Sequence, residues 1–493
     1  MKIFAYAESH PQEILAVTDD GEKIPYGIMN ELGRTLRDIV GHRLVFVLCR
    51  NTPGSLLGYL GLLQSGGVPL LLDDVIAPAL LEELVRTYRP AFCLVPMDLP
   101  KESREAFKKG LEKGLMEGSA REVTEALRIR DYKLLRCAPD GTDPVLAPKL
   151  RLLLTTSGST GSSKLVRISA ENLDSNAVSI IKYLQITKTD RPITVLPMQY
   201  SYGMSILHTH VMAGATILLT RHTLMEKRFW ERVRKEGATS LCGVPYTFEM
   251  YARIGLMDMD LPALRTVTQA GGKLPEKRHL QFAEWAAKKR IRFYVMYGQT
   301  EASPRMSWLP PEKAIEKCGS MGIAIPGGKL ELADSEAENH CEEAVGELVY
   351  TGPNVALGYA LCAGDLRKGD EFHGILHTGD MARRDADGYF YIVGRRSRFI
   401  KIAGKRIGHD EAEKILRARF PELDLACAGK DEKLCIFVGD PAADQPQPAV
   451  LAEDLSDCIE EMTGIPQSRT HVSFLPELPR SSSGKVLYSE LKP

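Results

Sequence analysis

The segment from Leu152 to Ser169, LLLTTSGSTGSSKLVRIS, constrains the fold of this chain more than any other. Its apolar start breaks into a loop of glycine, serine and threonine that reaches Lys164, and apolar and β-branched residues follow. This pattern predicts a strand, a loop and a second strand. Glycines let a backbone approach a ligand closely, hydroxyls donate hydrogen bonds, and a lysine adds positive charge. The segment therefore predicts a site for phosphate oxygens.

This loop differs from the P-loop of many nucleotide-binding proteins. The P-loop pattern, G-x-x-x-x-G-K-[ST], places its lysine directly after the second glycine and opens a helix. Gly158 lies six residues before Lys164, as the first glycine of the pattern does, but Ser163 stands in place of the second glycine, and Leu165 stands where the pattern needs serine or threonine. The residues that follow are typical of a strand. We therefore expect phosphates to be held by a different arrangement.

Length and charge narrow the function classes. A chain of 493 residues is too long for one typical core, so two or more domains are expected. With 63 basic against 64 acidic residues, the net charge of −1 predicts no general attraction to nucleic acid or to an anionic membrane. No apolar run reaches the about 20 residues of a spanning helix. Ten cysteines without a C-x-x-C pair favour buried thiols in a reducing cytoplasm.

The order of apolar segments predicts an α/β fold. The first strand candidates are 44–49, 68–72 and 91–95, with helices at 54–64 and within the charged segment 101–127. A second α/β block has strand candidates at 194–196, 216–219, 240–244 and 292–296. Short strands with glycine-rich turns begin near Gly346, and helix and strand alternate again after Arg395. We predict α/β sheet subdomains and a short-stranded β subdomain in residues 1–395, and a smaller α+β domain in 396–493.

Five more segments accompany the phosphate loop. They are Met296–Glu301 (MYGQTE), Gly346–Tyr359, Leu376–Asp380 (LHTGD), Gly394–Ile407 and Leu478–Lys485 (LPRSSSGK). In this order and spacing they resemble the adenylate-forming, or AMP-binding, superfamily. That superfamily includes acyl-CoA synthetases, amino-acid-activating domains and firefly-type luciferases. Each motif is weak alone, but the six together cover nearly the whole chain.

The resemblance implies an ATP site. Its mobile loop over the β- and γ-phosphates corresponds to Thr156, Ser157, Gly158, Ser159, Thr160 and Gly161, followed by the loop lysine Lys164. Tyr297 corresponds to the ring that packs on adenine, beside Gly298, Gly271 and Gly272. Thr300 would hydrogen-bond phosphate and Glu301 would hold Mg²⁺, which prefers oxygen ligands.

Two further roles follow from the resemblance. Asp380 would accept hydrogen bonds from the ribose hydroxyls, assisted by Arg395. Lys485 would bridge the carboxylate and the phosphate during adenylation. Since both reactants are anions, positioning and cationic neutralisation should dominate catalysis.

The reaction that the resemblance implies has two halves. A carboxylate attacks the α-phosphorus of ATP to give acyl-AMP and pyrophosphate, and a thiol then takes the acyl group as a thioester. Between the halves the small, mobile domain (396–493) rotates about a hinge that corresponds to Ser397. The family usually has Asp or Lys there, so this hinge departs from its pattern. Lys401 and Gly404 would lie on the face that meets the thiol donor.

The acid pocket is predicted around Tyr200, Tyr246 and Gln269. Tyr200 stands where many acyl- and aryl-CoA synthetases have a histidine. No acidic residue occurs between Thr194 and Met225, so the ammonium of an amino acid would lack a partner. The residue types favour a small or medium acid with some polarity.

Three hypotheses stay open from the sequence. The chain forms an acyl-CoA, or it loads the phosphopantetheine arm of a carrier protein, or it is a non-catalytic nucleotide-binding homologue. The non-catalytic hypothesis is disfavoured because the chain keeps five of the family's charged and hydroxyl site residues: Lys164, Thr300, Glu301, Asp380 and Lys485. Ser163-Lys164-Leu165 departs from the family's usual Pro-Lys-Gly, which bears on the mobility of the loop.

Overall fold

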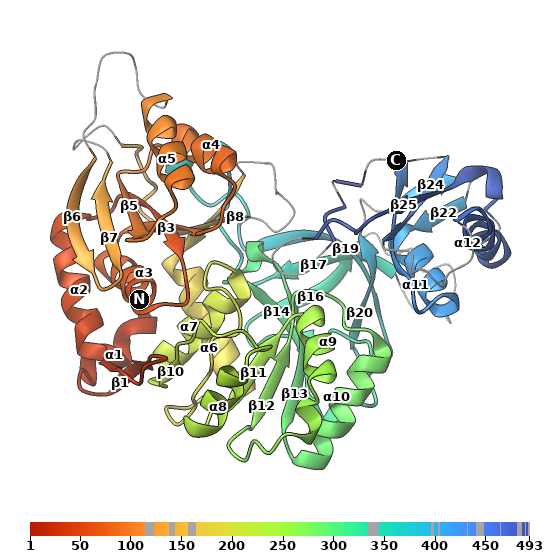
Figure 1. The fold of residues 1–493 in the computed structure, drawn as a ribbon, viewed down its shortest axis with the longest axis horizontal. Coiled ribbons are helices and arrows are strands. Elements are labelled where there is room, and N and C mark those ends of the chain that lie inside the picture. The colour runs from red at the N-terminus through yellow and green to blue at the C-terminus, as the bar shows by residue number, and fades with distance from the viewer. Residues whose placement is uncertain are drawn as a thin grey trace. The chain divides into compact units, whose positions relative to one another are not determined.

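The computed structural model groups the chain into two compact units (Figure 1). Met1–Lys329 with Tyr350–Leu376 form the large unit, and Leu330–Val349 with His377–Pro493 form the small unit. The described residues are 1–113, 123–137, 143–155, 164–333, 345–395, 399–402, 405–430, 432–439, 448–463, 465–480, 486–488 and 490–491. The domain boundary predicted from the sequence, which separates residues 1–395 from a mobile domain of residues 396–493, stays a prediction.

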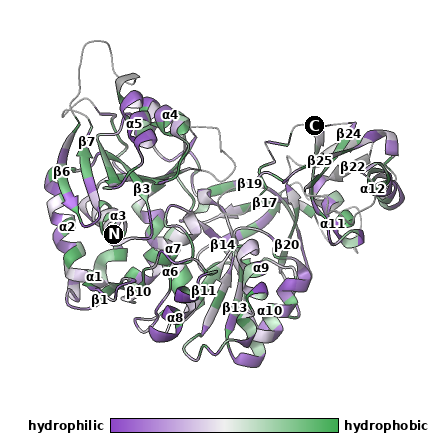
Figure 2. Ribbon diagram, in the orientation of Figure 1, coloured by the Kyte–Doolittle hydropathy of each residue, from purple (hydrophilic) through white to green (hydrophobic). Residues whose placement is uncertain are grey.

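An eight-stranded sheet forms one half of the large unit, in the order β18-β9-β8-β4-β3-β5-β7-β6. Its parallel centre confirms three predicted strands: β3 (Leu44–Cys49), β4 (Val68–Asp73) and β5 (Phe92–Pro96). The other strands are β8 (Leu150–Thr155), β9 (Leu165–Ser169), β7 (Tyr132–Arg136), β6 (Thr124–Ile129) and β18 (Gly358–Ala360). Strands buried on both faces are continuously apolar, as the green colour of β3 shows in Figure 2.

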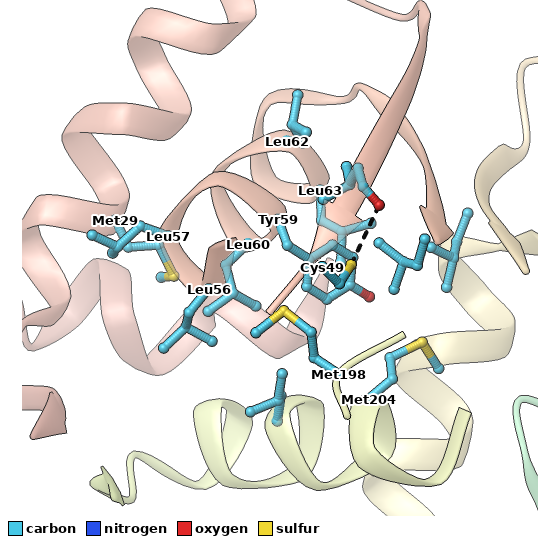
Figure 3. Packing of buried hydrophobic residues seen from close by; sticks show 14 of the residues in the cluster. Met29, Cys49, Leu56, Leu57, Tyr59, Leu60, Leu62, Leu63, Met198 and Met204 are labelled. Atoms are coloured by element: carbon cyan, nitrogen blue, oxygen red, sulfur yellow. Dashed lines mark hydrogen bonds between the residues drawn. The ribbon is translucent and has the colours of Figure 1, made fainter. Parts of the chain in front are cut away.

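Helix α3 (Pro53–Ser65) lies at the centre of the packing against this sheet. Its sequence is apolar on every side, which is typical of a helix with no solvent face. Figure 3 shows its leucines and Tyr59 packed among Met29 of α2 (Tyr26–Ile39), Met204 of α7 (Ser201–Ala213) and Met198, which lies just before α7. The helix ends at Gly66, whose φ of 100° favours glycine. This core fixes the start of α7, where the site residue Tyr200 lies.

A five-stranded sheet forms the other half of the large unit, in the order β11-β12-β13-β14-β15. Its strands are β11 (Ser240–Gly243), β12 (Thr266–Gln269), β13 (Arg292–Gly298), β14 (Arg305–Leu309) and β15 (Ile323–Ala324). The first three run parallel, and β13 and β14 are antiparallel. Helices of this unit also include α1 (Ala5–Ser9), α4 (Pro78–Tyr88), α5 (Lys101–Lys113), α6 (Ala170–Leu184), α8 (Lys227–Lys235), α9 (Pro245–Arg253) and α10 (Glu276–Lys289). A three-stranded sheet of β10 (Ile217–Leu218), β1 (Ile14–Val17) and β2 (Lys23–Pro25) completes it.

Three expectations from the sequence were wrong in whole or in part. The helical prediction over 101–127 is confirmed for α5, Lys101–Lys113, but is wrong for 124–127, which belong to strand β6. The segment 194–196 forms no strand, and the hydroxyl of Thr194 accepts a hydrogen bond from the N–H of Thr220. Cys318 is half-buried and Cys362 exposed, whereas the other seven described cysteines are buried.

In the described residues of the small unit, short sheets pack with two α-helices. β16 (Lys329–Ala333), β17 (Val345–Thr351), β19 (Ile375–Arg384) and β20 (Phe390–Arg395) form one sheet in that order. β21 (Phe399–Ile402) pairs with β22 (Lys405–Gly408), and β23 (Asp424–Lys430), β24 (Lys433–Gly439) and β25 (Thr470–Leu475) form a third sheet. Helices α11 (His409–Arg419) and α12 (Pro448–Thr463) share a core with that sheet. Within the described residues of both units, no helix is long and apolar enough to cross a membrane.

Candidate active site

Strand β13 brings the MYGQTE motif to its site. The strand ends at Gly298, and a short 3-10 turn from Thr300 to Ala302 follows at once. A Cβ at Gly298 would lie 1.8 Å from the carbonyl oxygen of Pro304, so only glycine allows this close approach. The strand end therefore holds Thr300 and Glu301 in a fixed position.

Tyr359 joins two predicted site residues. Its hydroxyl donates to Oε1 of Glu301 over 2.9 Å, and Nζ of Lys164 lies 3.4 Å from the centre of its ring. Strand β18 carries Tyr359 and pairs with β9, which begins directly after Lys164. Burial, then the nearby Glu301 carboxylate, raise the pKa of Tyr359, so its phenol keeps its proton. An ammonium and a carboxylate from distant parts of the chain thus share one aromatic side chain.

Both charges lack an ionic partner among the described residues. Lys164 and Glu301 are half-buried, and neither forms a salt bridge with any described side chain. An unpaired carboxylate suits Mg²⁺, and an unpaired ammonium suits a phosphate. Within the described residues there is no group of three or more His, Cys, Asp or Glu that could hold a metal alone. A magnesium ion at Glu301 would thus take further ligands from phosphate oxygens and water.

Tyr200 and Gln269, two of the predicted pocket residues, lie beside Gly271 and Gly272. A Cβ at Gly271 would lie 2.3 Å from Oη of Tyr200, and its φ of 84° also favours glycine. Gln269 is fully buried, and its Nε2 donates to the carbonyl of Gly272 over 2.8 Å, which fixes the loop. Tyr246, by contrast, is 55% exposed on α9.

The pocket adjoins the MYGQTE motif through Ser201. Thr300 Oγ1 lies 3.4 Å from Oγ of Ser201, the first residue of α7 and the neighbour of Tyr200. The predicted phosphate contact and the predicted acid pocket are therefore adjacent. Ser201 was not among the site residues predicted from the sequence, where its only signal is its position next to Tyr200. At Tyr297, Gln299 Nε2 lies 3.3 Å from its hydroxyl, and the adenine-packing role stays a prediction.

A cavity of about 40 Å³ lies between helices α6 and α7 and the five-stranded sheet. Arg305, at the start of β14, lines it together with Tyr202, Thr268 and His210. Sequence reasoning missed Arg305. The signal was a basic residue directly after the MYGQTEASP segment, in a stretch that is otherwise apolar or small.

In the small unit, Asp380 and Arg395 lie opposite each other on β19 and β20. Arg395 Nε is 3.1 Å from Oδ1 of Asp380, and the aspartate is only 4% exposed. The Asp380 backbone N–H donates to the Thr378 hydroxyl over 3.1 Å. Asp380 and Arg395 therefore form an ion pair, and the contact of Asp380 with the ribose stays a prediction.

Several predicted residues lie outside the described residues: Thr156, Ser157, Gly158, Ser159, Thr160, Gly161, Ser397, Gly404 and Lys485. Lys401 belongs to β21, and its side chain is not described. Their roles stay predictions.

Comparison with known proteins gives consistent results. The family described as AMP-binding enzyme matches residues 4–360. An indoleacetate–CoA ligase of Aromatoleum aromaticum is 29% identical over 356 residues, covering 71% of this chain and 68% of the relative. A probable 4-coumarate–CoA ligase of Dictyostelium discoideum is 27% identical over 507 residues, covering 97% and 89%.

Solved structures share the fold. O-succinylbenzoate coenzyme A synthetase from Bacillus subtilis, in complex with AMP, gives a TM-score of 0.75 at 21% identity, covering 100% of this chain and 98% of that one. ATP-bound MatB from Rhodopseudomonas palustris gives 0.75 at 21% identity, covering 99% and 98%. These matches confirm the predicted α/β architecture.

Proposed function

The chain belongs to the AMP-binding enzyme family, and from this premise we propose that it is an acid–thiol ligase. It activates a carboxylic acid with ATP, forming acyl-AMP and pyrophosphate, and then transfers the acyl group to the thiol of coenzyme A. The observation that carries this proposal is that Lys164 and Glu301 both contact Tyr359, Lys164 over its ring and Glu301 at its hydroxyl. The names of the relatives as CoA ligases support coenzyme A as the acceptor.

Each site residue has a physical task in adenylation. Glu301 would hold Mg²⁺, which when bound would supply positive charge to the phosphate oxygens. Lys164 and the Thr156–Gly161 loop hold the outer phosphates, and Thr300 donates to a phosphate oxygen. Asp380, which is paired with Arg395, accepts hydrogen bonds from the ribose hydroxyls. Lys485 neutralises the attacking carboxylate and the α-phosphate, which otherwise repel each other.

The test of this proposal has two stages. The first measures pyrophosphate release with ATP, Mg²⁺ and a panel of carboxylic acids. The second adds either coenzyme A or a phosphopantetheinylated carrier protein and identifies the thioester by mass spectrometry. No pyrophosphate with any acid, despite bound ATP, would show a nucleotide-binding homologue instead. The cytoplasmic location expected from the cysteine pattern stays a prediction.

Replacing Tyr359 with phenylalanine should weaken the binding of Mg²⁺ at Glu301. The ring that contacts Lys164 is kept, but Glu301 loses the 2.9 Å hydrogen bond that orients its carboxylate. Loss of such an orienting contact typically costs about 10- to 100-fold in metal affinity or activity. We expect a higher Mg²⁺ concentration at half-maximal pyrophosphate release. Tyr391→Phe is the control, since its hydroxyl contacts Asp385 in the small unit. Equal Mg²⁺ dependence of the wild type and Tyr359→Phe would contradict the role.

Replacing Gly271 with alanine should narrow the acid pocket. The new Cβ would lie 2.3 Å from Oη of Tyr200 at a positive φ, so the ring must move. Overpacking costs about 1–3 kcal/mol, and we expect the KM for the acid to rise by about tenfold or more, with a smaller change in the KM for ATP. Gly327→Ala is the matched control, because its φ is 86° but nothing lies within 4 Å of the added Cβ. An unchanged KM for the acid would place the pocket elsewhere.

A further inference from the structure

Arg305 is a buried cation at the edge of the predicted acid pocket. The residue is 3% exposed, and its Cζ lies 4.6 Å from the centre of the Tyr202 ring. Its guanidinium also interacts with the hydroxyl of Tyr183, yet its Nε is buried without a hydrogen-bond partner. Since arginine does not lose its proton in proteins, this charge is permanent.

No described carboxylate compensates this charge. Arg305 forms no salt bridge with any residue in the described ranges. Asp190, the acidic residue that lines the same cavity, accepts from Thr187 and Thr239 and lies 3.1 Å from Arg265. Burying a charge without a counter-charge is costly, so a site that keeps one calls for an anionic partner. Within the described residues the protein does not provide that partner.

The position of Arg305 connects it with the substrate. It lines the 40 Å³ cavity with Tyr202, whose hydroxyl lies 2.7 Å from that of Thr268. Burial raises the pKa of Tyr200, and the positive charge of Arg305 opposes that rise, so the two side chains are close enough to interact. The Tyr200 and Tyr202 rings are 6.4 Å apart, edge to face. Tyr202 therefore contacts both Tyr200, in the predicted acid pocket, and Arg305.

We propose that Arg305 binds a second carboxylate at the far end of the substrate, and that the preferred acids are dicarboxylic. The planar guanidinium matches a carboxylate through parallel hydrogen bonds, and its unused Nε supplies one donor. The carboxylate that reacts lies beside Thr300 and Ser201, and the second enters the cavity. This inference rests on the proposed function, because it concerns the acid pocket of the same site.

The experiment compares acids that differ only in the second charge. Pyrophosphate release is measured with linear dicarboxylic acids of increasing length and with the half-amide of each, which keeps the shape but is neutral at that end. For the best chain length, we expect the wild type to favour the diacid by about tenfold or more in kcat/KM. Arg305→Met should abolish this preference mainly by raising the KM of the diacid. Arg305→Lys, which keeps the charge but not the planar fork, should retain part of it.

The controls separate the pocket from the fold. Arg292→Met removes a guanidinium from the neighbouring strand β13, where it donates to Gln185 and Thr266, and should keep the preference for diacids. A second measurement needs no turnover. The rise in melting temperature on adding a diacid, without ATP, should appear in the wild type and in Arg292→Met and should be lost in Arg305→Met.

The outcomes are distinguishable. If the wild type releases pyrophosphate but prefers half-amides, or if Arg305→Met keeps the diacid preference, the inference is overturned while the proposed function stands. If no acid gives pyrophosphate, the proposed function fails, and the thermal measurement decides the role of Arg305. Absence of stabilisation by every diacid in the wild type would then overturn the inference as well.

Discussion

Replacing Lys485 with alanine is expected to lower the rate of acyl-AMP formation by on the order of 10²- to 10³-fold, the usual loss for one charge-stabilising group. The two reactants of this step are anions, and the resemblance places this lysine between them. Thioester formation from supplied acyl-AMP should be largely unchanged, because no new bond to phosphorus forms in that step. The effect should therefore separate the two half-reactions.

The measurement follows each half-reaction alone. Pyrophosphate release reports the first, and thioester formation from synthetic acyl-AMP and coenzyme A reports the second. Lys433→Ala removes an exposed lysine at the start of β24 in the small unit and serves as the control. An equal loss in both half-reactions of Lys485→Ala would contradict its assignment to adenylation.

Replacing Glu301 with glutamine should lower the rate of acyl-AMP formation about as much as Lys485→Ala does, because it weakens the binding of Mg²⁺. The amide oxygen still accepts the Tyr359 hydroxyl, so the local contact is preserved, but the negative charge that attracts Mg²⁺ is lost. We expect pyrophosphate release to fall by on the order of 10²- to 10³-fold and its Mg²⁺ dependence to shift to higher concentration.

Two comparisons make this test specific. Glu312→Gln removes an exposed carboxylate from the same unit and should leave the Mg²⁺ dependence unchanged. The double variant with Tyr359→Phe should lose less than the product of the single losses, since both substitutions act on one carboxylate. Independent, fully multiplicative losses would show that Tyr359 acts on something other than Glu301.

Much of the fold could be predicted from local sequence patterns. Buried parallel strands such as 44–49 and 68–72 are continuously apolar, and the structure places both in the large sheet. Strands β12 and β14 were not predicted, because their residues, Thr266–Gln269 and Arg305–Leu309, mix polar and apolar types. The strand predicted at 194–196 was wrong, because the pairing there does not extend beyond Thr194, whose N–H donates to the carbonyl of Leu218 and whose hydroxyl accepts from the N–H of Thr220.

The site was predictable as a set of motifs but not as a set of contacts. The sequence placed Lys164 and Glu301 in separate motifs, and only the pairing of β18 with β9 shows that Tyr359 contacts both. Arg305 belongs to none of the six motifs identified in the sequence. Its significance depends on burial and on the lack of a described counter-charge, and both are properties of the packed structure.

The central claim is that the acid attacks the α-phosphorus of ATP. The direct measurement uses the acid that releases most pyrophosphate, labelled with heavy oxygen in its carboxylate, in a complete reaction with ATP, Mg²⁺ and coenzyme A. Mass spectrometry then locates the label. The account predicts one labelled oxygen in AMP, because the carboxylate oxygen stays on phosphorus when the thiol takes the acyl group. Label in inorganic phosphate, with AMP unlabelled, would contradict it.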